Sequence, residues 1–432
     1  MESKSADIQR AIIVFVDFNK SSTDDAFNEF VQLVDSAGLD VVGSITAPRQ
    51  AADAQFFVGS GKADEIAREA EALDVDVVIF NHPLTPAQER NLDKHIKIRV
   101  IDRIGLILDI FAQRARSYEG KLQVELAQLQ HLSTRLIRGW THLERQKGGI
   151  GLRGPGETQL ETDRRLVGFR IKLINQRLDK VRKQRFLSRQ QRKKNDVPVI
   201  SLVGYTNAGK STLFNRLSGA NVRAADQLFA TLDPTLRRVE TDSGRNIILT
   251  DTVGFIRDLP HDLIDSFQAT LEEVREADLL IHVIDVDHEQ RQQRIDDVNK
   301  VIELIDAGDV PQIEVYNKID KYPEQSARVE NSDNYPHPRI WLSSHTGEGL
   351  PLLSEGIDKH LAQATTPYHL SLPVTAGHLR AKLFDLGAVR HDDANEEGGW
   401  FMEVEMEEFR LHKLCEEASL DITQLQSGPA PY

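Results

Sequence analysis

Residues 204–211 (GYTNAGKS) have the glycine, lysine and serine spacing of a P-loop, and this motif constrains the fold more than any other part of the chain. The apolar run 199–203 before it indicates a buried strand, and the chain from Leu213 onward has a helical pattern. In such a strand–loop–helix unit, backbone N–H groups and the helix N-terminus point at phosphate. Lys210 adds positive charge and Ser211 can ligate Mg²⁺. The sequence therefore predicts a nucleotide-binding α/β domain.

Three further motifs follow in the order that a GTPase requires. Residues 251–254 (DTVG) end an expected strand, which brings the Asp251 carboxylate near a metal and the Gly254 amide near the γ-phosphate. Residues 317–320 (NKID) end an expected strand at 313–316. Asp320 can accept two hydrogen bonds from the guanine N1–H and amino group, and it would reject adenine. Residues 343–345 (SSH) follow the apolar run 340–342, where a backbone amide can meet guanine O6.

A segment rich in possible switch residues lies between the P-loop and Asp251. Residues 229–235 (FATLDPT) contain two threonines, Thr231 and Thr235, that can complete a Mg²⁺ shell and sense the γ-phosphate. Either threonine has a sequence position that suits this role. The alternative is a proline-containing turn before an expected strand at 236–241.

The first hundred residues alternate short apolar runs with helical patterns. Strands are expected at 11–18, 39–47, 75–80 and 96–102, and helices at 24–37, 62–73 and 85–94. This alternation predicts a small α/β domain. Residues 59–62 (GSGK) suggest a second nucleotide site, but Phe56 stands where a P-loop requires its first glycine.

A long helical hairpin is expected next. Leucines and a tryptophan recur at steps of three and four, which indicates one stripe on a long helix: Leu122, Leu126, Leu129, Leu132, Leu136, Trp140 and Leu143. A glycine-rich loop at 148–158 separates it from a second helix. Between Arg164 and Lys194 that helix carries 13 Lys and Arg against one acid, Asp179. Contact with a nucleic acid and a solvated helix face both explain this charge.

Composition limits the class of protein. The chain of 432 residues has 40% hydrophobic and 28% charged residues and a net charge of −14, which is typical of globular proteins. No apolar run approaches the roughly 18 residues that cross a bilayer. Cys415 is the only cysteine, so no internal disulfide forms. We expect a cytoplasmic monomer without integral membrane insertion, and partial membrane association is the alternative.

Together these motifs resemble the HflX family of translation-factor-related GTPases, in the Obg–HflX group. The most specific segments are GYTNAGKS, FATLDPT, DTVGF, NKID and GGIGLRGPGETQLETDRR at 148–165. The resemblance covers nearly the whole chain. It implies four domains: a small α/β domain (1–108), a helical hairpin (109–196), a GTPase domain (197–364) and a small α/β C-terminal domain (365–432).

The resemblance also implies a function. Family members bind the ribosome, chiefly the large subunit and its RNA, through the basic hairpin and the glycine-rich loop. Their assigned role is GTP-dependent splitting or rescue of stalled ribosomes, notably in heat stress. The alternative is a GTP-dependent binding module that regulates a protein or membrane partner. A third hypothesis makes the N-terminal domain an ATP-using RNA remodeller.

By the same resemblance, Thr231 ligates Mg²⁺ beside Ser211, and Lys210, Thr231 and Gly254 act in catalysis. Phe255 stands where many GTPases carry a glutamine, which predicts slow hydrolysis until ribosomes stimulate it. Asn207 is similar to an asparagine that holds K⁺ in related GTPases. The residues expected to bind GTP or GDP are Gly204, Tyr205, Thr206, Asn207, Ala208, Gly209, Lys210, Ser211, Phe229, Ala230, Thr231, Leu232, Asp233, Asp251, Thr252, Val253, Gly254, Asn317, Lys318, Ile319, Asp320, Ser343, Ser344 and His345.

Overall fold

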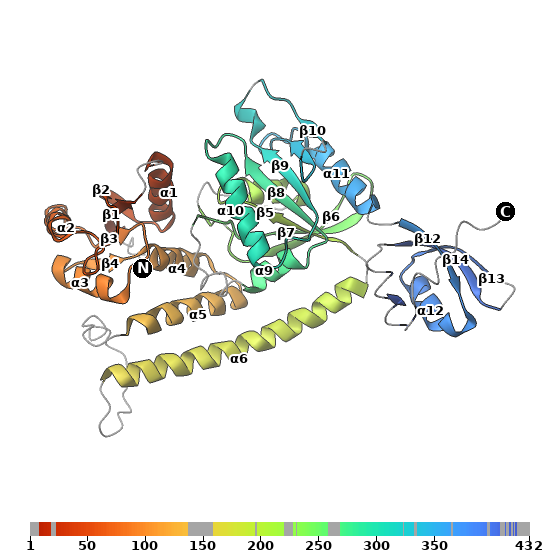
Figure 1. Cartoon of the computed structure of the whole chain (residues 1–432), viewed down its shortest axis with the longest axis horizontal. Coiled ribbons are helices and arrows are strands. Elements are labelled where there is room, and N and C mark those ends of the chain that lie inside the picture. The colour runs from red at the N-terminus through yellow and green to blue at the C-terminus, as the bar shows by residue number, and fades with distance from the viewer. Residues whose placement is uncertain are drawn as a thin grey trace, which may run out of the picture.

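A computed structural model of the chain (Figure 1) describes residues 8–18, 23–136, 159–194, 197–219, 228–229, 231–257, 268–322, 324–331, 335–363, 366–394, 398–406, 411, 414–415, 418 and 420. The glycine-rich loop at 148–158, with Trp140, Leu143 and Ala230, lies outside these residues. Four parts follow one another along the chain, and each has its own set of helices or strands.

The N-terminal part is a four-stranded parallel sheet with the order β2-β1-β3-β4. Its elements are β1 Arg10–Asp17, α1 Thr23–Ser36, β2 Asp40–Pro48, α2 Ser60–Ala72, β3 Val77–Phe80, α3 Pro86–Ile96 and β4 Arg99–Ile101. The expected strands and helices are present with small shifts. Ile96 belongs to α3 rather than to a strand, because the left-handed Lys97 ends that helix one residue later.

Alternate side chains of β1 pack into two different apolar cores. Ala11, Ile13 and Phe15 face one apolar cluster, while Ile12 and Val14 face the other. This two-residue period follows from the pleat of the strand. The cluster that contains Ile13 continues into the GTPase domain, so the two domains share one core on that side.

Helices α4 Arg103–Arg114, α5 Tyr118–Arg135 and α6 Gln159–Lys194 follow. The boundary expected after residue 108 falls within α4, whose buried face packs in the N-terminal core. The expected apolar stripe is present on α5, where Leu122 and Leu126 pack against Ile174 and Leu178 of α6. Figure 1 shows α5 beside the N-terminal part of α6, and α6 continuing beneath the GTPase domain.

The GTPase domain is a seven-stranded sheet with the order β10-β11-β9-β8-β5-β7-β6. Its strands are β5 Val199–Val203, β6 Thr235–Glu240, β7 Asn246–Asp251, β8 Leu279–Asp285, β9 Gln312–Asn317, β10 Arg328–Glu330 and β11 Arg339–Trp341. Its helices are α7 Lys210–Ser218, α9 Gln268–Arg275, α10 Arg291–Leu304 and α11 Leu350–Gln363, with the 3₁₀ turn η2 Ile319–Lys321. The central strands are parallel, so the carboxyl ends of β5, β7 and β9 lie on the same side of the sheet.

The C-terminal part pairs three antiparallel strands with one helix. It contains β12 Thr366–Leu372, the 3₁₀ turn η3 Val374–Ala376, α12 Gly377–Asp385, β13 Val389–Ala394 and β14 Trp400–Met406. Met402, Val404 and Met406 are buried and alternate with more exposed residues, as a half-buried strand requires.

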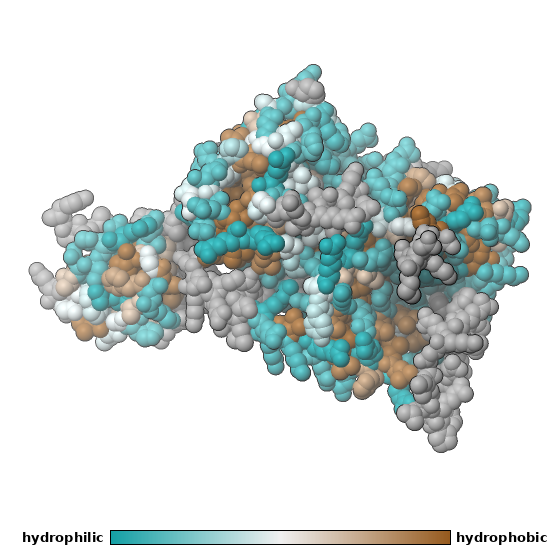
Figure 2. All heavy atoms as spheres, turned by 180° about the vertical axis from the view of Figure 1, so that it is seen from behind, coloured by the Kyte–Doolittle hydropathy of each residue, from teal (hydrophilic) through white to brown (hydrophobic). Residues whose placement is uncertain are grey.

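The described surface is mostly hydrophilic with separate apolar patches on the face that Figure 2 shows. Within the described ranges, every helix is too short or too polar to span a membrane.

Candidate nucleotide site

Two positions of the P-loop accept only glycine. Gly204 has φ +146°, and a Cβ there would lie 2.3 Å from the carbonyl oxygen of Val283. Gly209 has φ +99°, and a Cβ there would lie 2.2 Å from Nδ2 of Asn317. Both positions exclude a side chain by conformation and by space. The loop therefore joins β5 to α7 tightly enough to expose backbone amides at the helix N-terminus.

Lys210 is the first residue of α7, and its side chain is buried. Its Nζ donates to the carbonyl oxygens of Gly204 at 3.0 Å and Tyr205 at 2.7 Å. Burial lowers the pKa of Lys210 to about 8, although the nearby Asp251 carboxylate acts in the opposite direction. A buried ammonium group with few anionic neighbours is suited to bind phosphate oxygens.

Three oxygen-bearing side chains converge beside it. Ser211 Oγ donates to Asp251 Oδ2 at 2.7 Å, Thr231 Oγ1 donates to the same atom at 2.9 Å, and the two hydroxyls are 2.8 Å apart. Asp251 Oδ1 is buried and has no hydrogen-bond partner. Burial raises the pKa of Asp251 in spite of the hydroxyl donors and Lys210. Of the two candidate threonines, the structure brings Thr231 to this cluster, while Thr235 begins β6.

Gly254 lies beside both Thr206 and Lys210. A Cβ on Gly254 would be 2.9 Å from Thr206 Cγ2 and 3.1 Å from Lys210 Nζ. The main chain of Phe255 holds Gly254 against the P-loop. The Phe255 amide donates to Gly204 O at 3.1 Å, and its carbonyl accepts from Thr206 N at 2.7 Å. The DTVG segment is thus bound to the P-loop by main-chain hydrogen bonds.

The two motifs that are expected to recognise the base lie at the ends of β9 and β11. Asn317 Nδ2 donates to Ala208 O at 2.9 Å, and its Oδ1 accepts from Ser344 N at 2.8 Å. Lys318 Nζ donates to Asn207 O at 2.8 Å. The Ser343 hydroxyl donates to the Asp320 carboxylate. These hydrogen bonds connect the NKID and SSH motifs to the P-loop.

Other predicted residues form contacts within the protein. Thr252 Oγ1 donates to Leu202 O at 2.5 Å, and Val253 and Ile319 are buried. Arg216 donates to the carbonyl oxygen of His345. Tyr205 turns its hydroxyl toward the N-terminal domain, where it meets Glu29.

Part of the 229–235 segment packs on the N-terminal half of the chain. Phe229 is buried, and its ring meets that of Phe111 edge to face, with ring centroids 4.7 Å apart. Leu232 joins the same core, and Asp233 accepts hydrogen bonds from the start of α5.

Sequence reasoning missed Glu29 and Arg103, which approach this site from α1 and α4. Neither residue belongs to a recognisable motif. The GSGK segment also differs from a nucleotide loop, since α2 begins at Ser60 and Lys62 forms an ion pair with Glu65 at 2.8 Å.

Comparisons with known proteins agree with this geometry. Three family models match in succession: "GTP-binding GTPase N-terminal" at 24–112, "GTP-binding GTPase Middle Region" at 114–192 and "50S ribosome-binding GTPase" at 199–318. The chain is 52% identical over 409 residues to "GTPase HflX" of Escherichia coli (strain K12), which covers 95% of this chain and 96% of that protein.

A second relative is "GTPase HflX" of Caldanaerobacter subterraneus subsp. tengcongensis, at 44% identity over 92% of this chain and 91% of that protein. A solved structure of "SsGBP and GDP complex" is 26% identical and covers 82% of this chain and 99% of that chain, with a TM-score of 0.48.

Proposed function

Because this chain belongs to the HflX family of GTPases, binds GTP and hydrolyses it, we propose that it acts on the ribosome. In this proposal it binds the large subunit and couples GTP hydrolysis to splitting or rescue of stalled ribosomes. The family description "50S ribosome-binding GTPase" supports the choice of partner. A cytoplasmic location and a monomeric state are parts of the same proposal.

The observation that carries the proposal is the basic face of α6. Lys172, Arg177, Lys180 and Lys183 are all exposed. At 100° per residue they occupy a sector of about 140°. Ile174 and Leu178, which pack on α5, lie on the other side of the helix. Within the described part of the chain, the ion pairs of α6 are made by Arg170, Arg182 and Arg185 rather than by these four cations. A row of cations on one helix face suits contact with an RNA backbone.

We assign the chemical roles as follows. Lys210 and the P-loop amides stabilise charge on the transferring phosphate, Gly254 reads the γ-phosphate, and Asp320 selects guanine. Positioning and electrostatics supply most of the catalysis in phosphoryl transfer, so the absence of a general base among our assignments does not exclude hydrolysis.

The residues around Asp251 fit Mg²⁺. A hard divalent cation prefers oxygen ligands, and Ser211, Thr231 and the unpartnered Asp251 Oδ1 supply three such groups close together. Ser211 and Thr231 would hold the ion, with Asp251 beside them. When bound, Mg²⁺ neutralises charge on the phosphates.

We also propose that Asn207 holds K⁺ at the phosphates. Its φ of +60° and its exposed side chain leave the amide accessible at the P-loop surface. The proposal predicts faster hydrolysis in KCl than in NaCl, and equal rates would contradict it.

The intrinsic rate is expected to be low. Phe255 is 1% exposed and lies in the core, so its ring offers no hydrogen bond to an attacking water. A bound ribosome would then supply the missing stabilisation.

The test measures GTP hydrolysis with and without purified large subunits at two salt concentrations. We expect stimulation that decreases as salt rises, because phosphate contacts release counterions. The triple variant Lys172→Glu, Lys180→Glu, Lys183→Glu should lose this stimulation but keep its basal rate. The control replaces three exposed lysines elsewhere, Lys94, Lys300 and Lys359, by glutamate.

Equal loss in both triple variants would indicate a net-charge effect and contradict a role of α6. Stimulation by a protein partner that is insensitive to salt and RNase would favour the GTP-dependent binding module instead.

A further inference from the structure

The hydroxyl of Tyr205 joins the P-loop to the N-terminal domain. It donates to Glu29 Oε2 on α1 at 2.5 Å and accepts from the backbone amide of Arg257 at 2.8 Å. Tyr205 is 5% exposed. Burial and the neighbouring Glu29 carboxylate raise the pKa of Tyr205, so the hydroxyl remains a donor to Glu29 at physiological pH. One side chain of the P-loop therefore contacts two other segments at once.

Arg103 completes this contact from the start of α4. Its Nη2 donates to Glu29 Oε1 at 3.0 Å and to the carbonyl oxygen of Arg257 at 3.0 Å. The side chains of Glu29 and Arg103 are only 11% and 9% exposed. Both backbone polar groups of Arg257 are thus held, the amide by Tyr205 and the carbonyl by Arg103.

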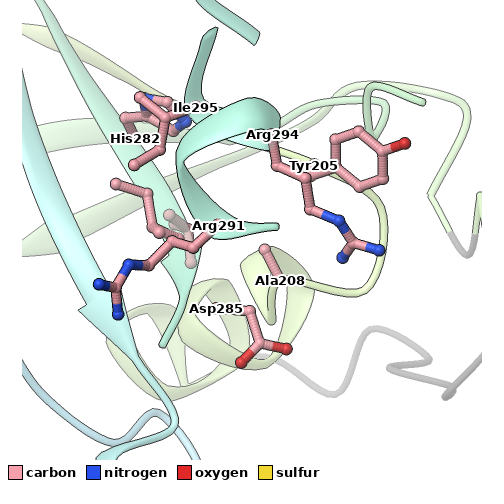
Figure 3. A pocket seen from close by; sticks show the side chains of 9 residues that line it. Tyr205, Ala208, His282, Asp285, Arg291, Arg294 and Ile295 are labelled. Atoms are coloured by element: carbon pink, nitrogen blue, oxygen red, sulfur yellow. The ribbon is translucent and has the colours of Figure 1, made fainter. Parts of the chain in front are cut away.

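The Tyr205 ring is fixed on its other side as well. The Arg294 guanidinium of α10 lies over the ring at 4.4 Å from its centroid, and Figure 3 shows the two side chains next to each other among those that line a small pocket. A cation over the ring and a carboxylate at the hydroxyl limit the ring to one orientation.

This contact is close in the chain to Gly254, the residue that we assign to the γ-phosphate. Arg257 is three residues after Gly254, and Phe255 between them is bound to Gly204 and Thr206 by main-chain hydrogen bonds of 3.1 and 2.7 Å. Gly254 itself adjoins Lys210 Nζ. Gly254 and Arg257 therefore belong to one short segment, 254–257, which contacts the P-loop at one end and is held by Tyr205 and Arg103 at the other.

We propose that Glu29 of the N-terminal domain is a positioning residue for GTP hydrolysis, acting through Tyr205 and Arg103 on the segment 254–257. With Phe255 in place of a water-orienting side chain, the rate depends on the position of the Gly254 backbone. The N-terminal domain controls that position through Glu29. This role rests on the GTPase activity and is independent of the ribosomal partner.

The experiment uses the full chain and measures single-turnover hydrolysis of saturating Mg-GTP, with GTP and GDP affinities measured separately. Glu29→Ala and Tyr205→Phe should each lower the rate of hydrolysis by about tenfold. This factor corresponds to the loss of one hydrogen bond to a charged group in the transition state. Nucleotide affinities should change less than about twofold, because the hydrogen bond between Tyr205 and Glu29 lies at α1 and does not involve the backbone amides of the P-loop.

Glu29→Gln keeps an acceptor for the Tyr205 hydroxyl and should restore part of the rate. The double variant Glu29→Ala, Tyr205→Phe should lose less than the product of the two single losses, since both single variants remove the hydrogen bond between Tyr205 and Glu29. Asp35→Asn, at an exposed position of α1, removes one negative charge from the same helix and should leave the rate unchanged.

An unchanged or increased rate in both single variants would overturn the proposal. So would losses that multiply in the double variant, because they would show that the two residues act separately. A parallel loss of GDP affinity would indicate a general structural defect and also overturn it.

Discussion

The carboxylate of Asp233 accepts hydrogen bonds at 2.7 Å from the backbone amides of Arg116 and Ser117, more than a hundred residues earlier in the chain. The Ser117 hydroxyl donates to the same carboxylate at 2.5 Å and caps α5 by accepting from Gly120 N at 2.8 Å. A segment expected to contact nucleotide is therefore attached to the helical hairpin close to Thr231.

Asp233→Ala should destabilise the fold. It leaves two backbone amides at the start of α5 without their acceptor, which costs about 1–2 kcal/mol. The expected result is a lower urea midpoint of unfolding. Asp242→Ala, in an exposed turn between β6 and β7, is the control and should leave the midpoint unchanged. Equal midpoints for the two variants would contradict a stabilising role of Asp233.

Thr231→Val should raise the Mg²⁺ concentration that gives half-maximal hydrolysis by about tenfold or more, because it removes one of the clustered hydroxyls. A magnesium titration of the hydrolysis rate measures this. Thr235→Val makes the same chemical change at the start of β6 and should have little effect. If Thr235→Val has the larger effect, the assignment of the metal ligand is wrong.

Phe255→Gln should not accelerate hydrolysis, although glutamine occupies this position in many GTPases. The Phe255 ring is buried in the shared core, so a glutamine there would bury an amide and remove packing. We expect a loss of about 2–4 kcal/mol in stability. Phe401→Gln, at a half-exposed site on β14, is the matched control. A faster variant would show that the side chain can reach the attacking water.

Asp320→Asn should lower GTP affinity by about a hundredfold or more and favour xanthosine triphosphate, because an amide cannot accept both guanine hydrogen bonds. Competition binding with the two nucleotides measures the change. Asp309→Asn, at an exposed position before β9, should bind GTP normally. Retained GTP preference in Asp320→Asn would place base recognition elsewhere.

Nucleotide affinity should fall as pH rises through about 8, since burial lowers the pKa of Lys210 to about 8. Below that pH the free protein already carries the ammonium that phosphate binds. Above it, binding requires uptake of a proton, and affinity falls by up to about tenfold per pH unit. GDP titrations across this range test the prediction. Lys210→Arg stays charged, so any residual binding should not vary with pH. A flat profile in the unmodified protein would contradict the lowered pKa.

Sequence alone predicted the structural elements that are determined by residues close together in the chain. The strand 199–203, the P-loop glycines and the helix after them follow from apolar runs, positive φ and spacing, although α7 begins at Lys210, before the expected Leu213. The apolar stripe on α5 is of the same kind. Periodicity reports which face is buried without reference to the rest of the fold.

Tertiary structure decided which distant side chains meet. Position alone left Thr231 and Thr235 equivalent and only the family resemblance favoured Thr231, whereas packing brings Thr231 to Ser211. Nothing near Tyr205 in the chain indicates Glu29, which lies 176 residues away. Such contacts depend on how two domains pack over a shared core, and that packing is a property of the whole chain rather than of any motif.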